Sequence, residues 1–599
     1  MSTGSSNALS FDDILVKYAG EFGRYQLKLL LISSLMWIPN CLVILFMVFH
    51  SSPDPITSHY WQCTNSSDTA CLSVYSEADP SAGFCTLARS QYEWTHKSRS
   101  ILSQFDLVCS RAWQAQLANS IFFFGYLIGS GFFGSLADSR GRKRSNLLCL
   151  AIAVSGALLT GISPNFGVYT FFRFITGIGA AGQALTTYIL ATESIGPKWR
   201  GIAGVATQLY FTAGEFVLVL VAVIFKDWRA LCFACAAISA AAAFLFPWIP
   251  ESPRWLLVKG RVAEANNEIR KIAATNGAIL PANVLPGEGG EEGGASRERG
   301  LGTSDRPHNS NHGNGNSGGY SATAGVGDEE ATGREPDSMA LDHGVISASS
   351  IAPSVMTSST SPDSTPNPPT KLTLRMILKD SHILRRFLIL SYVWAVLCLG
   401  YYGISLALGG LPGSIYATFC ISAAAEFIAN VLAAWLIEKI GRHNTMAGGM
   451  LLGGLSCVIC SIVPAGNGQA ILASIGKFGC SAAFTVASIY TSEMFPTLVR
   501  SAVLGVENEA ARVGGIAAPF IVLAGTTMHK PAVPFVIFGV TMLVGGVSIF
   551  TLPETLGTAL PDTMQDMDQI TSVFTTRPWQ SGGGWQATAR EMFRFRAGG

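Results

Sequence analysis

The chain has 599 residues, of which 49% are hydrophobic and only 13% are charged. Soluble domains carry about 25% charged residues, so this composition excludes an ordinary soluble enzyme and predicts a polytopic membrane protein. The 40 basic and 39 acidic residues nearly cancel, so no excess charge indicates a nucleic-acid partner. The mean hydropathy, +0.36, is positive although the chain contains long polar segments.

Apolar runs long enough to cross a bilayer follow one another along the chain. Each run has to be helical, because lipid offers no partner to backbone N–H and C=O groups. The runs cover residues 27–49, 114–136, 145–163, 168–190, 202–225, 230–249, 387–409, 414–437, 445–464, 469–490, 501–524 and 533–553. The predicted fold class is an all-α polytopic membrane protein with twelve transmembrane helices in two six-helix halves, 27–249 and 371–553.

Charges in the short loops orient these helices. Cytosolic loops of membrane proteins carry an excess of Lys and Arg. One alternate set of loops carries Arg140, Arg142, Lys143, Arg144, Lys198, Arg200, Lys439, Arg442 and Arg500, and the opposite set carries Lys226, Arg229 and Lys530. We therefore predict a cytosolic N-terminal segment at 1–26, an extracellular loop at 50–113, a cytosolic amphipathic segment at 250–280, a disordered cytosolic linker at 281–370 and a cytosolic tail at 554–599. The linker is rich in Gly, Ser, Asn, Pro and Thr and cannot bury enough apolar surface to fold.

The predicted extracellular loop has the composition of an oxidising compartment. It contains Cys63, Cys71, Cys85 and Cys109, an even number that predicts two disulfides with three alternative connectivities. It also contains the sequon Asn65-Ser66-Ser67, which predicts glycosylation of Asn65. Sequons also occur by chance, but here the charge bias and the cysteines indicate the same side of the membrane.

The two halves repeat a string at the end of their second spans. GSLADSRGRK at 134–143 corresponds to AWLIEKIGRH at 434–443, with the acid, the Gly and the Arg at the same spacing. Two membrane halves that repeat in parallel are typical of the major facilitator fold, and the first string resembles the signature of that superfamily. The resemblance implies transport by alternating access.

Further residues near the helix ends repeat in the same way. The resemblance implies that acids at helix ends pair with arginines of the opposite bundle when the cytosolic side is closed and separate when it opens. The residues assigned this gating or conformational role are Gly134, Asp138, Gly141, Arg142, Glu193, Arg200, Glu251, Arg254, Glu438, Gly441, Arg442, Glu493, Arg500 and Glu554. The alternative is that they only fix topology and cap helices.

Other strings resemble a narrower family. They are QFDLVC at 104–109, PESPRWL at 250–256, SEMFPTLVR at 492–500 and LPETLGTALPDT at 552–563. With the cysteine-bearing outer loop, they resemble the organic cation/anion/carnitine transporter family across both halves. PESPRW also occurs in sugar transporters, so QFDLVC and the outer loop discriminate better. The short outer loop and the long linker indicate a distant, plant or algal relative.

Two charges lie in the middle of predicted spans. Glu426 and Arg512 would each cost about 3 kcal/mol or more as isolated charges in lipid, so we expect both to face a central cavity and to bind substrate. The alternative is that they pair with each other, or with Glu507, Glu509 or Lys477, and only hold the bundle together.

The family resemblance gives these two positions a meaning. Members that transport cations carry an acid at both positions, and members that transport anions carry Arg at the second and Lys one turn after the first. Here Arg512 departs from the cation pattern and Asn430 departs from the anion pattern. Glu426 with Arg512 resembles the carnitine or zwitterion branch, because Arg grips a carboxylate and Glu faces an ammonium.

Three more residues complete the predicted substrate site. Tyr401 and Tyr402 form a pair that the family often carries in this span, and a ring face attracts an ammonium. Lys477 is another charge inside a span, and Glu215 is a candidate for coupling to a proton or another ion, with sodium as the alternative to the proton.

The expected function is therefore secondary or facilitative transport of small organic cations or zwitterions such as carnitine. The alternatives are an organic anion transporter led by Arg512 and Lys477, a sugar/proton symporter, and a transporter-like receptor. We expect no enzyme activity, no cofactor and no metal site, because the chain contains no Walker loop and no clustered His/Cys spacing. The plasma membrane is the expected location, with the vacuolar membrane as the alternative.

Overall fold

A computed structural model describes residues 11–281 except 52–55, 57–58 and 78–80, residue 285, residues 380–557 except 412, 465, 529 and 531, and residue 561. Nearly all of the predicted linker and most of the predicted C-terminal tail lie outside these described residues. Among them, twelve helical segments are long and apolar enough to cross a membrane, and each falls on a predicted run, so the twelve predicted spans are confirmed.

The first six spans are formed by helices between residues 24 and 248. They are α2 (Arg24–Leu35) with α3 (Trp37–His50), α7 (Ala112–Arg140), α8 (Arg142–Gly161), α9 (Phe166–Glu193), α10 (Arg200–Ile224) and α11 (Trp228–Ala241), which a 3-10 helix (Ala242–Trp248) continues. Further short helices are α1 (Phe11–Ile14), which a π-helix (Leu15–Ala19) continues, α12 (Pro253–Val258) and α13 (Val262–Asn276).

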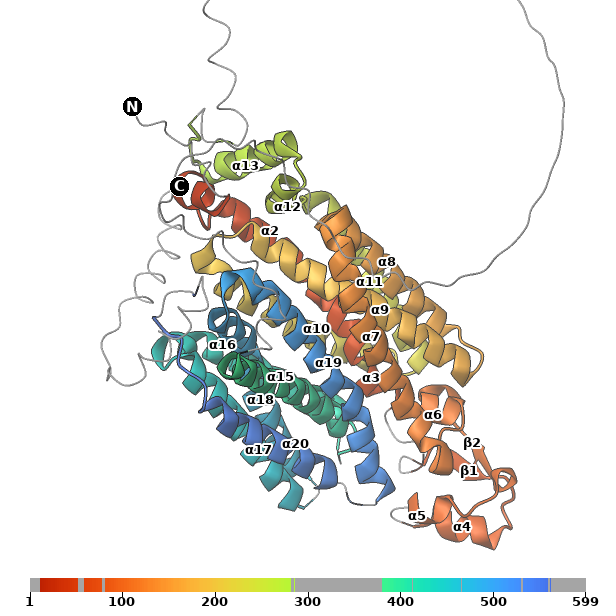
Figure 1. The fold of residues 1–599 in the computed structure, drawn as a ribbon. Helices are drawn as coiled ribbons and strands as arrows, with labels where there is room; N and C mark the ends of the chain where they lie inside the picture. The colour runs from red at the N-terminus through yellow and green to blue at the C-terminus, as the bar shows by residue number, and fades with distance from the viewer. Residues whose placement is uncertain are drawn as a thin grey trace, which may run out of the picture. The chain divides into compact units, whose positions relative to one another are not determined.

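The last six spans are formed by single helices. They are α15 (Ser381–Leu408), α16 (Ile415–Lys439), α17 (Arg442–Ile462), α18 (Asn467–Met494), α19 (Thr497–Thr527) and α20 (Ala532–Ile549). The two sets pack against each other along two seams, α7 against α19 and α10 against α16 (Figure 1). These seams bring residues from both sets to the same central region.

The first span is broken in the middle, which its hydropathy does not reveal. α2 ends at Leu35, and α3 begins at Trp37. Pro39 explains the break, because its ring clashes with the carbonyl group four residues earlier, that of Leu35. The two pieces together still make one span of 27 residues, Arg24–His50.

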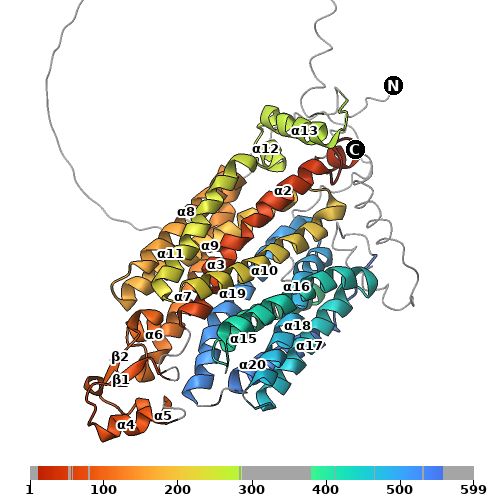
Figure 2. The same cartoon turned by 180° about the vertical axis from the view of Figure 1, so that it is seen from behind.

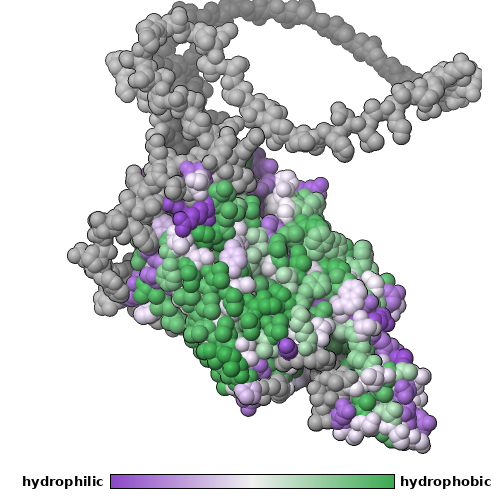
Figure 3. Space-filling model, turned by 60° about the horizontal axis from the view of Figure 1, so that its bottom comes forward, coloured by the Kyte–Doolittle hydropathy of each residue, from purple (hydrophilic) through white to green (hydrophobic). Residues whose placement is uncertain are grey.

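Large apolar side chains cover the outside of the helices. Figure 3 shows a broad apolar face with polar residues gathered toward the ends. Leu220 is 62% exposed and Ile462 is 78% exposed. Exposed apolar area of this extent is what a lipid-facing bundle requires and what a soluble protein avoids.

The described residues between 56 and 111 form a small folded cap at one end of the helices (Figure 2). Its strands β1 (Trp61–Cys63) and β2 (Tyr92–Trp94) pair antiparallel, with Gln62 opposite Glu93. The helices α4 (Thr69–Tyr75), α5 (Ser81–Phe84) and α6 (Ile101–Gln104) accompany them, with 3-10 turns at Arg89–Gln91, Lys97–Arg99 and Cys109–Arg111. Trp61, Phe84 and Tyr92 form its own apolar core.

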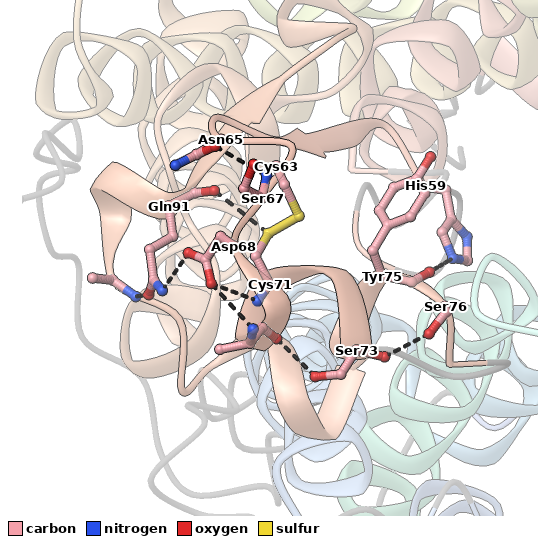
Figure 4. The surroundings of a disulfide bond; sticks show 12 residues. His59, Cys63, Asn65, Ser67, Asp68, Cys71, Ser73, Tyr75, Ser76 and Gln91 are labelled. Carbon is pink, nitrogen blue, oxygen red and sulfur yellow. Dashed lines mark hydrogen bonds between the residues drawn. A yellow bond between two sulfur atoms is a disulfide. The ribbon is translucent and has the colours of Figure 1, made fainter.

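The four predicted cysteines form two disulfides in this cap, Cys63–Cys71 and Cys85–Cys109. Figure 4 shows the first, beside Asp68 at the start of α4. Asp68 accepts hydrogen bonds from Gln91 Nε2 at 2.9 Å and from the N–H groups of Ala70 and Cys71. These bonds, chiefly that of Gln91, hold the pKa of the Asp68 carboxyl below its usual value.

α12 and α13 lie at the other end of the helices from the cap (Figure 1). The buried residues of α13 include Ala265, Ile269 and Ile272, three or four positions apart, so one face of this helix is covered. Phe11 and Ile14 pack on that face. The predicted amphipathic segment therefore anchors the N-terminal residues that the structure describes.

Candidate functional site

A buried lysine joins the two sets of helices at their centre. Lys477 Nζ of α18 lies 2.7 Å from Glu215 Oε1 of α10 and 3.1 Å from Glu426 Oε2 of α16. The Tyr401 hydroxyl of α15 lies within hydrogen-bond distance of both acids, 3.0 Å from Glu215 Oε1 and 3.2 Å from Glu426 Oε1, and can donate its proton to either. We call these four residues the Lys477 cluster.

The Lys477 cluster is sealed from solvent. The exposed fractions of the Lys477 and Glu215 side chains are 0%, and that of Glu426 is 3%. The ammonium group also lies 4.9 Å from the ring centroid of Tyr401 and 5.1 Å from that of Phe419. Two carboxylates and two ring faces together form a site that suits an ammonium group of any origin.

Polar residues connect this cluster to a small cavity. Thr212 Oγ1 donates to Glu426 Oε1 at 2.9 Å, Asn430 Nδ2 donates to Thr212 Oγ1 at 3.3 Å, and Thr485 Oγ1 donates to Asn430 Oδ1 at 2.7 Å. Thr485 also lines a cavity of about 30 Å³ between α9, α10 and α18, together with Gln208 and Ser488. A polar cavity of this size is large enough for a water molecule.

Arg512 of α19 lies at the other seam and has neutral partners. Its guanidinium donates to Asn508 Oδ1 at 2.8 Å and lies 4.3 Å from the ring centroid of Tyr126 of α7. The residue is 8% exposed, and no carboxylate of the described residues lies within 4.0 Å of it. The nearby Glu509 instead accepts a hydrogen bond from Ser130.

Aromatic rings separate Arg512 from the Lys477 cluster. The Tyr402 ring packs on Tyr401, with centroids 5.2 Å apart, and on Phe123 of α7, with centroids 4.6 Å apart. Phe123 packs on Phe122, which in turn packs on Tyr126 beside Arg512. Tyr401 and Tyr402 therefore point to different sites, and the two charged sites share one aromatic wall.

The structure thus brings Glu426, Tyr401 and Lys477 together with Glu215, and it places Arg512 and Tyr402 beside them. Glu426 pairs with Lys477 and not with Arg512, which selects one of the alternatives that the sequence left open. Sequence reasoning missed Phe419, Thr212 and Tyr126. Their residue types are ordinary in an apolar helix, so only their neighbours reveal them.

The repeated strings form matching clusters at the α12–α13 end. In the first half, Arg142 Nη2 lies 3.0 Å from Asp138 and 3.3 Å from Glu193, and its backbone N–H donates to Glu251 at 2.9 Å. In the second half, Arg442 makes the same contacts with Glu438 at 3.4 Å, with Glu493 at 3.2 Å and through its N–H with Glu554 at 2.9 Å.

In this conformation the described pairs lie within each half, and the predicted pairing across the bundles stays a prediction. Arg142 and Arg442 each bind acids of their own half, because the acid and the Arg of one repeat lie on neighbouring helices. Gly141 and Gly441 have φ angles of 103° and 94°, and a Cβ atom at either would collide with the carboxylate of Glu251 or Glu554. Glycine is therefore required at both turns. Gly134 lies within α7, where a Cβ would meet only Leu185.

Arg200 and Arg254 are the other two arginines of the first half that were predicted as gating residues. They share one acid, which the sequence did not single out. Asp12 Oδ1 of α1 lies 2.7 Å from Arg200 Nη2 and 2.5 Å from Arg254 Nη2. The N-terminal segment thereby joins the starts of α10 and α12. Arg500, the counterpart of Arg200, lies in the first turn of α19 and also has an interaction partner.

The QFDLVC string builds the junction between the cap and α7. Asp106 has a positive φ of 51°, and its carboxylate accepts a hydrogen bond from Trp94 Nε1 at 2.5 Å and pairs with Arg89 at 3.3 Å. Cys109 closes the second disulfide. Asn65 lies in an exposed turn, where its Oδ1 accepts a hydrogen bond from the Ser67 N–H at 3.0 Å.

Comparison with known proteins defines the class first. A family model described as "Sugar (and other) transporter" matches residues 59–282, and one described as "Major Facilitator Superfamily" matches residues 382–593. The inward-open structure of the xylose transporter XylE from E. coli aligns with a TM-score of 0.52 over 91% of this chain and 99% of that chain, at 13% identity. The fold is the major facilitator fold, and the chain is a multi-pass membrane transporter and not an enzyme.

Closer relatives then define the family. Organic cation/carnitine transporter 4 of Arabidopsis thaliana is 32% identical over 94% of this chain and 92% of its own length. Human solute carrier family 22 member 13 is 30% identical over 78% of this chain and 72% of its own length, and mouse solute carrier family 22 member 3 is 27% identical over 94% and 96%. The chain belongs to the organic cation/anion/carnitine transporter family and transports organic solutes.

Proposed function

We propose that this chain transports a small organic zwitterion, such as carnitine, by alternating access. The observation that carries the proposal is Arg512, a buried guanidinium with neutral partners among the described residues, in the same bundle as an acid-rich ammonium site. The two sites have opposite charge preferences and are separated by Tyr401 and Tyr402. A solute with one positive and one negative group matches that arrangement.

Arg512 supplies the site for the negative group. A guanidinium binds a carboxylate through two parallel hydrogen bonds, and its Nε makes no hydrogen bond with the described residues. An Arg buried in a membrane without a counter-ion is costly, so function is the usual reason to keep it. A carboxylate of the solute would supply the missing negative charge.

The Lys477 cluster supplies the site for the positive group. Glu215 lies on α10 of the first half, and Glu426 and Lys477 lie on helices of the second half. A relative movement of the halves therefore opens the contact between the acids. A solute ammonium can then lie between the two carboxylates and the ring faces of Tyr401 and Phe419.

The Lys477 contacts weigh against an organic anion as the main solute. An anion transporter led by Arg512 and Lys477 needs a lysine whose charge is available, but both acids of the cluster hold this ammonium group. Of the two cationic residues, Arg512 alone is then available to bind an anionic solute. The solute that uses both sites must also carry a positive charge.

Uptake measurements test this proposal. Proteoliposomes or oocytes that contain the chain are offered labelled carnitine, tetraethylammonium and benzoate. We expect carnitine uptake in the wild type, loss of carnitine uptake in Arg512→Gln with tetraethylammonium uptake kept, and loss of both in Glu426→Gln. Arg229→Gln is the control, because the hydrogen bonds of Arg229 to described residues go to the carbonyls of Gly161 and Ser163, away from both sites. Unchanged carnitine uptake in Arg512→Gln would contradict the proposal.

We place the chain in the plasma membrane with the cap outside and the α12–α13 end in the cytosol. The two disulfides of the cap and the exposed Asn65 sequon support this orientation, because both features belong to an oxidising compartment. The Arg142 and Arg442 clusters then hold the cytosolic helix ends of each half together during the movement. Removal of N-glycans should shift the gel mobility of the wild type and leave Asn65→Gln unchanged.

A further inference from the structure

We infer that the Lys477 cluster exchanges one proton for the ammonium group of the transported solute, with Glu215 as the proton carrier. The chain would then be a solute/proton antiporter. This inference rests on the proposed function, because it assumes that the solute carries a positive group that reaches this cluster.

The charge count of the cluster motivates the inference. One lysine faces two glutamates, so the net charge is −1 when all three are ionised. The groups are 0% to 3% exposed, and an uncompensated charge at such a depth is costly. The site therefore needs a second positive charge, which a solute ammonium provides when bound and a proton provides when the solute is absent.

Hydrogen bonding distinguishes the two acids. Glu426 accepts hydrogen bonds from Thr212 and Tyr401 on Oε1, and its Oε2 lies 3.1 Å from Lys477 Nζ as an ion pair, without a hydrogen bond from a described residue. Glu215 receives Lys477 and Tyr401 on the same oxygen, Oε1. Its Oε2 is buried and accepts no hydrogen bond from any described residue. The Lys477 ammonium is paired with Oε2 of Glu426 but with Oε1 of Glu215, so Glu215 Oε2 is the oxygen that we assign to the proton.

The other titratable groups around Glu215 come from four helices. They are Glu426 of α16, Lys477 of α18, Tyr401 of α15 and the Cys41 thiol of α3. The Lys477 ammonium and the Tyr401 hydroxyl both bond to Oε1, and Glu426 repels a second negative charge. Neutralisation of Glu215 thus removes the repulsion between the acids and keeps both bonds to Oε1.

The exchange cycle balances the charges on each side of the membrane. When the solute enters, its ammonium replaces the proton, which leaves Glu215 Oε2 for water on the side of entry. After the halves move, a proton from water on the opposite side binds Oε2 as the solute leaves. Thr212, Asn430 and Thr485 connect Glu426 of the cluster to the 30 Å³ cavity, so polar groups extend from that cavity to the acid that neighbours Glu215.

The experiment uses purified full-length chain in proteoliposomes, with labelled carnitine and tetraethylammonium as probes and a pH dye inside. We expect about one proton to move against each solute, and an inside-acid gradient of one pH unit to support about tenfold accumulation. Replacement of sodium by potassium should change neither the number of protons moved per solute nor the accumulation of the solute. Solute binding to the wild type should weaken as the pH falls, because the proton and the ammonium compete for the same site.

Glu215→Gln isolates the carrier, because Gln resembles the neutral acid in shape and keeps an oxygen for Lys477 and Tyr401. We expect weak binding that does not change with pH, and no proton movement. Glu507→Gln is the matched control, since Glu507 is also 0% exposed but lies outside the cluster, and it should keep both proton movement and pH dependence. Proton movement that survives in Glu215→Gln, or coupling to sodium alone, would overturn the inference.

The two proposals fail separately. Tetraethylammonium that exchanges with protons while carnitine is not transported would contradict the zwitterion proposal and support the exchange. Carnitine transport that depends on Arg512 but moves no proton would support the zwitterion proposal and overturn the exchange. Binding of neither probe would contradict both.

Discussion

The Lys477 cluster and Arg512 are two buried cationic sites in one helix bundle, and the protein treats them in opposite ways. Lys477 has two carboxylates within 3.1 Å, and Arg512 has an amide and an aromatic ring. Among the described residues, the first charge has two ion-pair partners and the second has none within 4.0 Å. Burial alone therefore does not identify a binding residue. The informative property is whether the protein supplies the counter-charge.

The largest expected effect is the loss of the internal cation. Lys477→Met leaves two buried carboxylates facing each other, and breaking a buried ion pair costs about 3–5 kcal/mol. We expect a much lower thermal unfolding temperature of the detergent-purified protein. Glu215→Gln combined with Lys477→Met should recover part of the loss, because it removes one carboxylate. An unchanged unfolding temperature in Lys477→Met would show that the cluster is not neutralised as described.

Arg512→Gln tests the buried charge that has no carboxylate partner within 4.0 Å among the described residues. No carboxylate loses a partner in this variant, so we expect the unfolding temperature to stay close to that of the wild type. The kcat/KM for carnitine should fall about 10- to 100-fold, since a hydrogen bond to a charged group contributes about 1.5–3 kcal/mol. Strong destabilisation together with equal loss of all solutes would assign Arg512 a structural role.

The Arg142 and Arg442 clusters are equivalent in the two halves. They therefore test how much a partly buried arginine contributes to stability. Their guanidinium side chains are 12% and 14% exposed and contact equivalent acids. We expect Arg142→Gln and Arg442→Gln each to destabilise the protein by about 1 kcal/mol, by similar amounts in thermal unfolding. Very different shifts would mean that one cluster also contacts the other half in another conformation.

The smallest effect is expected at Asp12, which is 32% exposed. Its two arginine contacts are screened by solvent, so Asp12→Asn should change the unfolding free energy by about 0.2–1 kcal/mol. Limited proteolysis offers a sharper measurement, because the loss of both contacts should release the N-terminal segment and expose it to cleavage. An unchanged cleavage rate would show that the apolar contacts of Phe11 and Ile14 suffice to hold it.

The cap shows which parts of the fold the sequence could predict. The four cysteines predicted two disulfides, but their spacing left three connectivities open, and only the folded cap shows that Cys63 meets Cys71 and Cys85 meets Cys109. The break between Leu35 and Trp37 was likewise hidden, because mean hydropathy does not register a single proline. The sequence named the arginines of the repeats as gating residues, and the structure adds that in this conformation Arg142 and Arg442 bind acids of their own half.

The sequence by itself determined the twelve spans, the internal repeat and the family. These follow from composition and local pattern, because lipid forces every apolar run into a helix and a duplicated string keeps its spacing. The tertiary structure alone decided which buried charges meet. Glu215 and Lys477 are 262 positions apart, and their contact depends on the rotation and packing of α10 and α18. Hydropathy carries no information about that rotation, so the sequence could name the charges but not their partners.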